Sequence, residues 1–210
     1  MEENMSEMKT YVMRGIARYP KLSKPFSFDN ATNSFVEDYD KGDYSTLLEI
    51  PTSDIDEHIK LLSSIQDELY NELVQSKKYD PKIEIIISDL PIKEGRDQDN
   101  KPNRNTLFKF KRACTNKKGE KAKIFIVDKY KNEMSEDQVL SLGGGSDMKI
   151  KYTPYAWDKL VKDIKTRSQY VQFGITLCML AVQVIKPVNY GGSLDCFDIE
   201  EEIGNEQIPF

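Results

Sequence analysis

The sequence is poor in the residues that build disulfide frameworks, zinc sites and membrane spans. It has three cysteines and one histidine among 210 residues, too few for paired disulfides or a typical zinc site. No apolar run reaches the roughly 18 residues that a membrane-spanning helix needs. The acidic start MEENMSEMK also lacks the apolar stretch of a secretory signal. These absences predict a soluble intracellular protein.

Catalytic motifs are missing as well. His58 has no nucleophile near it in the sequence, and the glycine run at residues 143–145 precedes Ser146 rather than the Lys-Ser or Lys-Thr of a phosphate-binding loop. These glycines are more typical of a tight turn before a strand. Asp128 and Asp147 are candidate ligands for a divalent ion, which is a weak signal in a chain this charged. We therefore predict that the protein is not an enzyme and has no metal or cofactor.

The net charge of −5 hides an uneven distribution along the chain. Residues 1–106 hold 14 basic and 21 acidic side chains, whereas residues 107–167 hold 15 basic and 8 acidic ones. Residues 195–210 contain no basic residue and six acidic ones, namely Asp195, Asp198, Glu200, Glu201, Glu202 and Glu206. A basic centre suits a polyanionic partner, and an acidic end without helix or strand periodicity suits a flexible tail.

Strand-forming segments dominate the rest of the chain, with one long helix among them. Their pattern predicts strands over residues 10–17, 44–50, 83–88, 106–113, 122–130, 147–155 and 170–185. Apolar residues at helical spacing predict a helix from an N-cap at Ser53 to about Gln75. Residues 18–33 are expected to form a loop or a bent exit from the first strand, and residues 94–105 an exposed loop. Residues 157–167 are expected to form a short helix or an irregular excursion.

Several short strands with one interposed helix predict a mainly β fold. The architecture that fits this size is an OB-fold-like antiparallel barrel with one long inserted α-helix. We assign residues 1–192 to this single domain and residues 193–210 to a flexible acidic C-terminal tail.

Two predicted strands alternate lysines with apolar residues, so the lysines share the outward faces. These lysines are Lys109, Lys111, Lys149 and Lys151. If the two strands are neighbours in the barrel, the four lysines form one basic surface, which can replace counterions along a nucleic-acid backbone. Lysines on the solvent side of strands also protect sheet edges in other proteins, so this pattern alone leaves both interpretations open.

Aromatic residues accompany both basic segments of the chain. Tyr155 and Trp157 follow Pro154 at the end of a strand and suit base stacking if they project from the barrel. The alternative is that Trp157 is a core residue. Nearer the N-terminus the basic and aromatic residues interleave: Arg14, Arg18, Lys21 and Lys24 alternate with Tyr19, Phe26 and Phe28. This stretch is equally compatible with a solvated loop that its rings anchor to the body.

Several segments, taken in order, resemble one known family. They are TLFKFKRACTNKKGEKAKIFIVD, LGGGSDMKIKYTPYAW, QVIKPVNYGG and the acidic tail that ends in Phe210. Together they resemble the single-stranded DNA-binding proteins of short-tailed bacteriophages of the T7 type. The resemblance spans most of residues 9–192, and its specific motifs lie within residues 106–157.

The resemblance implies an OB-fold that binds single-stranded DNA with little sequence preference. It further implies that the protein coats and anneals strands in phage DNA replication and recombination, forms a homodimer, and acts in the cytoplasm of the infected bacterium. The acidic tail would bind the DNA polymerase and the primase-helicase. The positions that match the family's DNA-binding residues are Lys109, Lys111, Lys149, Lys151, Tyr155 and Trp157, with Arg14 or Arg18. Those that match its partner-binding tail are Asp198, Glu200, Glu201, Glu202 and Phe210.

The sequence departs from this family in two regions. Its tail is shorter and less acidic, and the ending Ile208-Pro209-Phe210 resembles bacterial single-stranded DNA-binding proteins, so the partner is either a phage or a host enzyme. Residues 83–104 also differ in content from the family, so no contribution to the DNA-binding groove can be transferred to them. A second hypothesis is an interaction adaptor whose OB-like barrel binds an acidic protein; an assay of single-stranded DNA binding separates the two.

Overall fold

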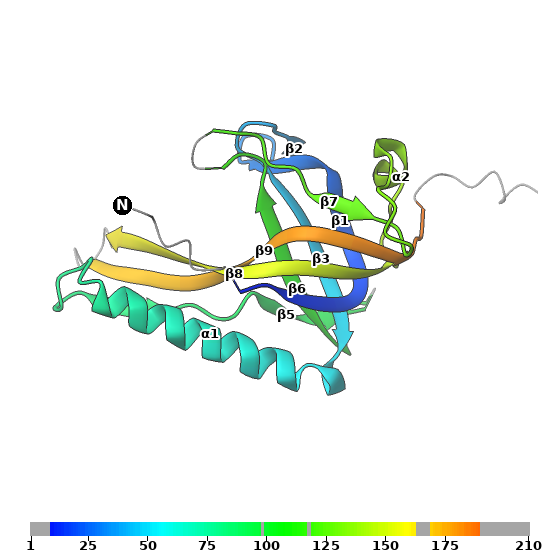
Figure 1. The fold of residues 1–210 in the computed structure, drawn as a ribbon. Coiled ribbons are helices and arrows are strands. Elements are labelled where there is room, and N and C mark those ends of the chain that lie inside the picture. The colour runs from blue at the N-terminus through cyan, green and yellow to red at the C-terminus, as the bar shows by residue number, and fades with distance from the viewer. Residues whose placement is uncertain (1–8, 98, 117–118, 163–168, 190–210) are drawn as a thin grey trace, which may run out of the picture.

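Five strands close a barrel in the computed structural model, which describes residues 9–97, 99–116, 119–162 and 169–189 (Figure 1). They are β1 (Tyr11–Asp29), β3 (Asp43–Pro51), β6 (Pro102–Ala113), β8 (Asp147–Lys162) and β9 (Gln169–Lys186). The strands pair in the antiparallel order β9-β8-β1-β3-β6, and a parallel pairing of β6 with β9 closes the ring. This mainly β, OB-fold-like barrel confirms the predicted fold class.

Four short strands extend the sheet at its margins. β2 (Ser34–Glu37) pairs with the end of β1, and β5 (Ile92–Arg96) pairs with β6. β4 (Glu84–Ile87) and β7 (Phe125–Val127) both run parallel to β9, at different places along it. A short helix, α2 (Glu136–Leu140), follows β7.

β8 and β9 extend past the barrel as a two-stranded arm. β1 accompanies β8 only as far as the pair of Tyr11 with Tyr152, whereas β8 and β9 stay paired up to Lys162 and Gln169. Strand β4 pairs with β9 along this arm. Beyond Thr153, β8 therefore pairs with β9 and no longer with β1.

The long helix α1 (Asp56–Gln75) lies along one side of the arm, after the 3₁₀ turn η1 (Thr52–Asp54) (Figure 1). It packs through rings such as Tyr70, whose centroid is 5.8 Å from that of Phe173 in β9. Gln66 is buried and donates a hydrogen bond to the carbonyl oxygen of Ser88. Among the described residues, none of the helices is long and apolar enough to cross a membrane.

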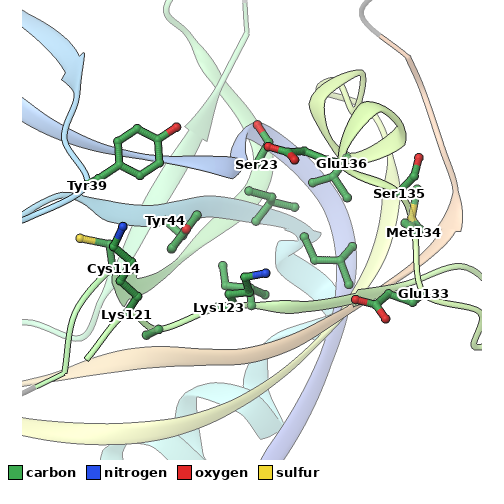
Figure 2. A pocket seen from close by; sticks show the side chains of 15 residues that line it. Ser23, Tyr39, Tyr44, Cys114, Lys121, Lys123, Glu133, Met134, Ser135 and Glu136 are labelled. Atoms are coloured by element: carbon green, nitrogen blue, oxygen red, sulfur yellow. The ribbon is translucent and has the colours of Figure 1, made fainter. Parts of the chain in front are cut away.

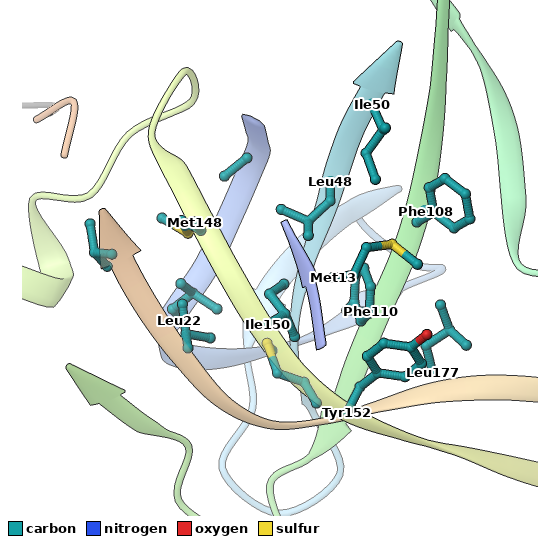
Figure 3. Packing of buried hydrophobic residues seen from close by; sticks show 14 of the residues in the cluster. Met13, Leu22, Leu48, Ile50, Phe108, Phe110, Met148, Ile150, Tyr152 and Leu177 are labelled. Atoms are coloured by element: carbon teal, nitrogen blue, oxygen red, sulfur yellow. The ribbon is translucent and has the colours of Figure 1, made fainter. Parts of the chain in front are cut away.

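The barrel interior is filled by side chains that alternate inward along its strands (Figure 3). The largest fully buried ones include Met13, Leu48, Phe108, Phe110, Met148, Ile150, Tyr152 and Leu177. The rings of Phe110 and Tyr152 meet edge to face at 5.2 Å. Burial raises the pKa of Tyr152 to about 12, so its hydroxyl stays neutral inside this apolar layer.

The first strand is longer than predicted. Residues 18–29, for which Pro20 and Pro25 left a loop or a bent strand exit open, belong to β1, so the bent strand is the correct alternative. The chain bends at Tyr19, where φ is 50°, and the register against β3 shifts on both sides of Lys21. Each proline falls within one of these shifts, where the missing N–H breaks no regular ladder bond.

The structure also corrects other predicted boundaries. β8 continues to Lys162, so residues 157–162 are strand rather than helix, because β9 pairs with them throughout. Only Phe125–Val127 of the predicted strand 122–130 is strand, and it pairs with β9. Part of the predicted loop 94–105 belongs to β5 and β6. Ser53 lies in η1 and is not the N-cap of α1, which starts after Ile55 without a side-chain cap.

The segment that follows α1 forms hydrogen bonds with Asp158 of the arm. The Asp158 carboxylate accepts hydrogen bonds from Lys78, at 2.6 Å, and from the hydroxyl of Tyr79. These hydrogen bonds lower the pKa of Asp158 below its ordinary value of 3.8, against the opposite effect of burial.

Replacing Asp158 by Asn is therefore expected to lower the free energy of unfolding at neutral pH by about 1 kcal/mol. Because the folded-state pKa is depressed, the native carboxylate stabilises the fold above its unfolded pKa, and this contribution disappears as the pH falls through the folded value. Urea unfolding at neutral pH and at about pH 3 should show a gap between the two proteins that shrinks in acid. Asp67→Asn, an exposed change on α1, should show no such gap; an equal gap there would contradict the assignment.

Candidate nucleic-acid interface

Lys109 and Lys111 lie on the outer face of β6, opposite the buried Phe108 and Phe110. Lys111 forms an ion pair of 3.0 Å with Asp43 of the neighbouring β3. Within the described part of the chain, Lys109 forms no ion pair. Its partial burial, followed by repulsion from Lys111, lowers the pKa of Lys109. An anion beside this ammonium group would offset both effects.

Lys149 and Lys151 lie on the outer face of β8, between β1 and β9. β6 and β8 are not neighbours, because β9 lies between them. The four lysines therefore do not lie on adjacent strands, as a single basic surface would require. The two lysine pairs lie instead on either side of β9.

The two arginines of β1 belong to different lysine pairs. Arg14 is opposite Lys149 in the β1–β8 register, whereas Arg18 is in line with Lys109 through Leu47 of β3. Both arginines are held by carboxylates. Arg14 donates two hydrogen bonds to Asp147, at 3.0 and 2.6 Å, and these hold the pKa of Asp147 below its ordinary value.

Arg18 binds the carboxylate of Glu49 at 2.5 Å. Burial by itself acts to raise the pKa of Glu49. Hydrogen bonds from Arg18, Asn105 and Asn103 outweigh that effect, so the pKa of Glu49 is lowered and the carboxylate stays ionised. The charge of each arginine is thus largely balanced within the protein.

Tyr155 and Trp157 lie on the arm, on the face opposite Phe173 and helix α1. Tyr155 is 49% exposed. The indole of Trp157 lies over the backbone of Gly174, its partner in β9, where a Cβ atom would come within 2.6 Å of the ring. Trp157 is only partly buried and is not among the core residues, so the interpretation of Trp157 as a core side chain is wrong.

Closure of the barrel brings these rings close to the lysines of β6. Lys111 is paired with Cys178 of β9, and Cys178 is paired with Thr153 of β8. Paired residues share a face, so the outer side of Lys111 continues across β9 toward Tyr155, two residues beyond Thr153. Strand spacing of about 4.8 Å puts the β6 and β8 backbones roughly 10 Å apart here.

Phe125, which the sequence analysis did not single out, lies near the lysine pair of β8, Lys149 and Lys151. It is 57% exposed and paired with Ala181, which is in turn paired with Lys151. Its exposure follows from the short strand β7, in which the alternate residue Ile126 enters the core. Alternation within residues 122–130 was the available signal, but it does not say which strand lies beside β7.

Figure 2 shows a cavity that other residues line. Its volume is about 670 Å³, and its polar lining includes Lys121, Lys123, Glu133, Ser135 and Glu136, with Tyr39 and Tyr44. None of the predicted DNA-binding residues lines it. The lining carries charges of both signs, so it does not distinguish an anionic from a cationic ligand.

The candidate divalent-ion ligands are already engaged within the fold. Asp128 accepts hydrogen bonds from the backbone N–H groups of Tyr130 and Asn132, and Asp147 binds Arg14. Across the described ranges, no group of three or more His, Cys, Asp or Glu side chains could hold a metal ion. The predicted tail residues, including Asp198, Glu200, Glu201, Glu202 and Phe210, lie outside the described residues.

Comparison with known proteins identifies the architecture. No model of a protein family matches the sequence, and no curated protein does. The solved structure of gp2.5, a single-stranded DNA-binding protein encoded by bacteriophage T7, superposes with a TM-score of 0.58 at 23% identity, over 96% of this chain and 100% of that one. The chain has the fold of that phage protein.

A second solved structure agrees with this result. The single-stranded DNA-binding protein from bacteriophage Enc34, in complex with single-stranded DNA, superposes with a TM-score of 0.51 at 19% identity, over 87% of this chain and 89% of that one. The predicted resemblance is thus confirmed for the fold, over nearly the whole length of each chain.

The contact between Trp157 and Gly174 can be tested directly, because Trp157 is the sole tryptophan. Gly174→Ala introduces a Cβ closer than 3.0 Å to the indole, so we expect a shift in tryptophan emission and a loss of about 1–3 kcal/mol in unfolding free energy. In a Trp157→Leu background the same change should cost much less in urea unfolding. An equal cost in both backgrounds would show that the indole does not lie on Gly174.

Proposed function

We propose that this chain binds single-stranded DNA with little sequence preference and coats it. The observation that carries the proposal is the closure of β6 onto β9, which sets the outer face of Lys109 and Lys111 beside the arm that carries Tyr155 and Trp157. An unpaired strand offers both phosphates and exposed base faces. Cations and rings in reach of one another suit that ligand better than they suit a duplex, whose bases are stacked inside. The fold shared with two phage proteins described as single-stranded DNA-binding supports the same conclusion.

The lysines act by neutralising phosphates. Lys109 and Lys151 form no ion pair within the described residues, so their charge is available to a polyanion without breaking an internal contact. Lys111 must share its charge with Asp43. Arg14 and Arg18 form ion pairs with Asp147 and Glu49, so they contribute mainly by fixing neighbouring side chains and less by neutralising phosphates. Release of condensed counterions by the free lysines makes binding salt-dependent.

Trp157 and Tyr155 act by stacking on bases. The indole of Trp157 is held against Gly174 on one side and is partly exposed. A base can pack on such a ring without regard to its identity, because every base has a π-face. The proposal therefore needs no sequence readout and no chemical step.

Charge neutralisation predicts how two lysine variants behave. Lys109→Gln and Lys151→Gln should each weaken binding to oligo-dT and lower the slope of log affinity against log salt by about 0.7. The measurement is a fluorescence titration of each protein at several salt concentrations, with Trp157 as the probe.

Lys60→Gln is the matched control, since Lys60 is exposed on α1, on the other side of the arm. It should leave both affinity and slope nearly unchanged. An affinity that does not vary with salt, or an equal loss in the control, would contradict the electrostatic mechanism. If the unaltered chain binds no single-stranded DNA, the adaptor hypothesis replaces this one.

The broader role follows from the family resemblance. We propose that the chain serves phage DNA replication and recombination as a homodimer, that it anneals complementary strands, and that residues 193–210 bind the DNA polymerase and primase-helicase. Asp198, Glu200, Glu201, Glu202 and Phe210 supply charge and an aromatic group for this contact. A basic rim around an apolar pocket is the surface that such a segment fits.

Removing residues 195–210 should separate these two activities. The deletion removes six acidic residues and no basic one, so affinity for oligo-dT is expected to stay the same or to rise, most clearly at low salt. Binding to the replicative polymerase, measured by surface plasmon resonance, should be lost. A deletion that weakens DNA binding and keeps the polymerase contact would contradict the separation of the two activities.

A further inference from the structure

The hairpin of β1 and β2 exposes aromatic rings that the proposed function has not used. Phe28 and Phe35 face each other across the two strands, with centroids 5.3 Å apart in an edge-to-face arrangement. Phe28 is 48% exposed and Phe35 is 60% exposed. The two rings form one contiguous exposed apolar patch, and such patches commonly mark binding sites.

A lysine lies over one ring of this pair, Phe35, and also contacts Phe26. The ammonium nitrogen of Lys21 is 3.5 Å from the ring centroid of Phe35 and 4.8 Å from that of Phe26. Burial lowers the pKa of Lys21. Within the described residues, no carboxylate forms an ion pair with it. The hairpin thus combines exposed rings with a partly desolvated cation that lacks an anion.

The hairpin is continuous with the lysines of β6. Lys21 is paired with Ser45 of β3, which is paired with Lys111. A second connection runs through Asp43 of β3, which is paired with Phe26 and whose carboxylate binds Lys111 at 3.0 Å. β1 and β6 are two strand spacings apart, or about 10 Å. A ligand on Lys109 and Lys111 can therefore reach Lys21 and the rings by crossing β3.

The acidic residues of the hairpin are engaged in other contacts. Asp29 accepts a hydrogen bond from the backbone N–H of Ala31, and Asp38 accepts such bonds from Asp40 and Lys41. These bonds lower the pKa of both carboxyl groups. Glu37 is paired with Lys24 at 2.8 Å. The carboxylates are thus occupied in turns and in an ion pair.

We propose that the β1–β2 hairpin is a second stacking platform for single-stranded nucleic acid. A base packs against Phe35 and Phe28, and the adjoining phosphate binds Lys21. The bound strand crosses the barrel between this platform and the rings of the arm, over the lysines of β6. This inference rests on the proposed function and extends it to a site across the β6 lysines from the arm.

Nucleic acid fits the hairpin better than a protein segment does. A hydrophobic partner would cover Phe28 and Phe35 but would leave Lys21 without an anion. A nucleotide supplies a flat π-face that can cover the rings and a phosphate that can pair with Lys21. The direct continuity with Lys109 and Lys111 points to the same ligand.

Oligonucleotide length provides the test. Titrations use oligo-dT of about 4 and about 16 nucleotides, the range of site sizes of an OB fold, with Trp157 emission reporting on the arm. The double variant Phe28→Ala/Phe35→Ala should bind the long oligonucleotide at least about five-fold more weakly, the loss of one stacked base. It should bind the short one, detected by Trp157, as the unaltered protein does.

Three variants separate stacking from damage to the fold. Phe28→Leu/Phe35→Leu keeps apolar bulk without rings, and it should lose affinity for the long oligonucleotide as the alanine variant does. Lys21→Met should reduce the salt dependence for the long oligonucleotide only. Tyr130→Ala, which removes another exposed ring beside a lysine, Lys129 at 4.8 Å, should change nothing.

Other outcomes overturn the proposal. Unchanged affinity of both double variants for the long oligonucleotide would mean that the rings serve a protein contact. Full affinity of the leucine variant alone would mean that only packing is needed. An equal loss at both lengths, with unchanged thermal melting, would mean that the hairpin acts through the arm. If the unaltered protein binds neither oligonucleotide, the proposed function itself fails, and this result is distinct from the others.

Discussion

The parallel pairing of β6 with β9 is the contact on which the rest of the structure depends. It joins Phe110 to Leu177 and Lys111 to Cys178, and alternation then sends Phe110 into the core and Lys111 to the surface. The same closure aligns β6 with the strands that continue as the arm. Both pairs join residues 67 positions apart in the sequence, and such non-local pairing is hard to form early because it costs loop entropy. Once formed, it sets the core and the candidate interface together.

Internal ion pairs decide which basic residues remain available to a ligand. Arg14, Arg18 and Lys111 each bind a carboxylate of an adjacent strand. Lys109 and Lys21 form no ion pair within the described residues, and burial lowers the pKa of both, with repulsion from Lys111 adding to the effect at Lys109. The number of basic residues on these strands therefore overstates the charge that is available to a ligand. The cations that matter most for a polyanion are those without an internal carboxylate partner.

Much of the fold was predictable because its signals are local. Alternation along residues 106–113 and 147–155 predicted which side chains enter the core, and helical spacing predicted the end of α1 at Gln75. The sequence left open whether the chain past Pro20 is a loop or a bent strand, because the register shifts against β3 that accommodate the prolines depend on strand pairing. The extension of β8 to Lys162 likewise depends on its pairing with β9.

Side-chain order along single strands was enough to establish the class of the barrel, the outward faces of the lysines and the resemblance to a phage protein family. The folded chain was needed to show that β9 separates the two lysine pairs, that Trp157 lies on Gly174, and that Phe35 lies under Lys21. Each of these arrangements joins different strands. Periodicity within a strand carries no information about which strand lies beside it, so the neighbours had to come from the tertiary structure.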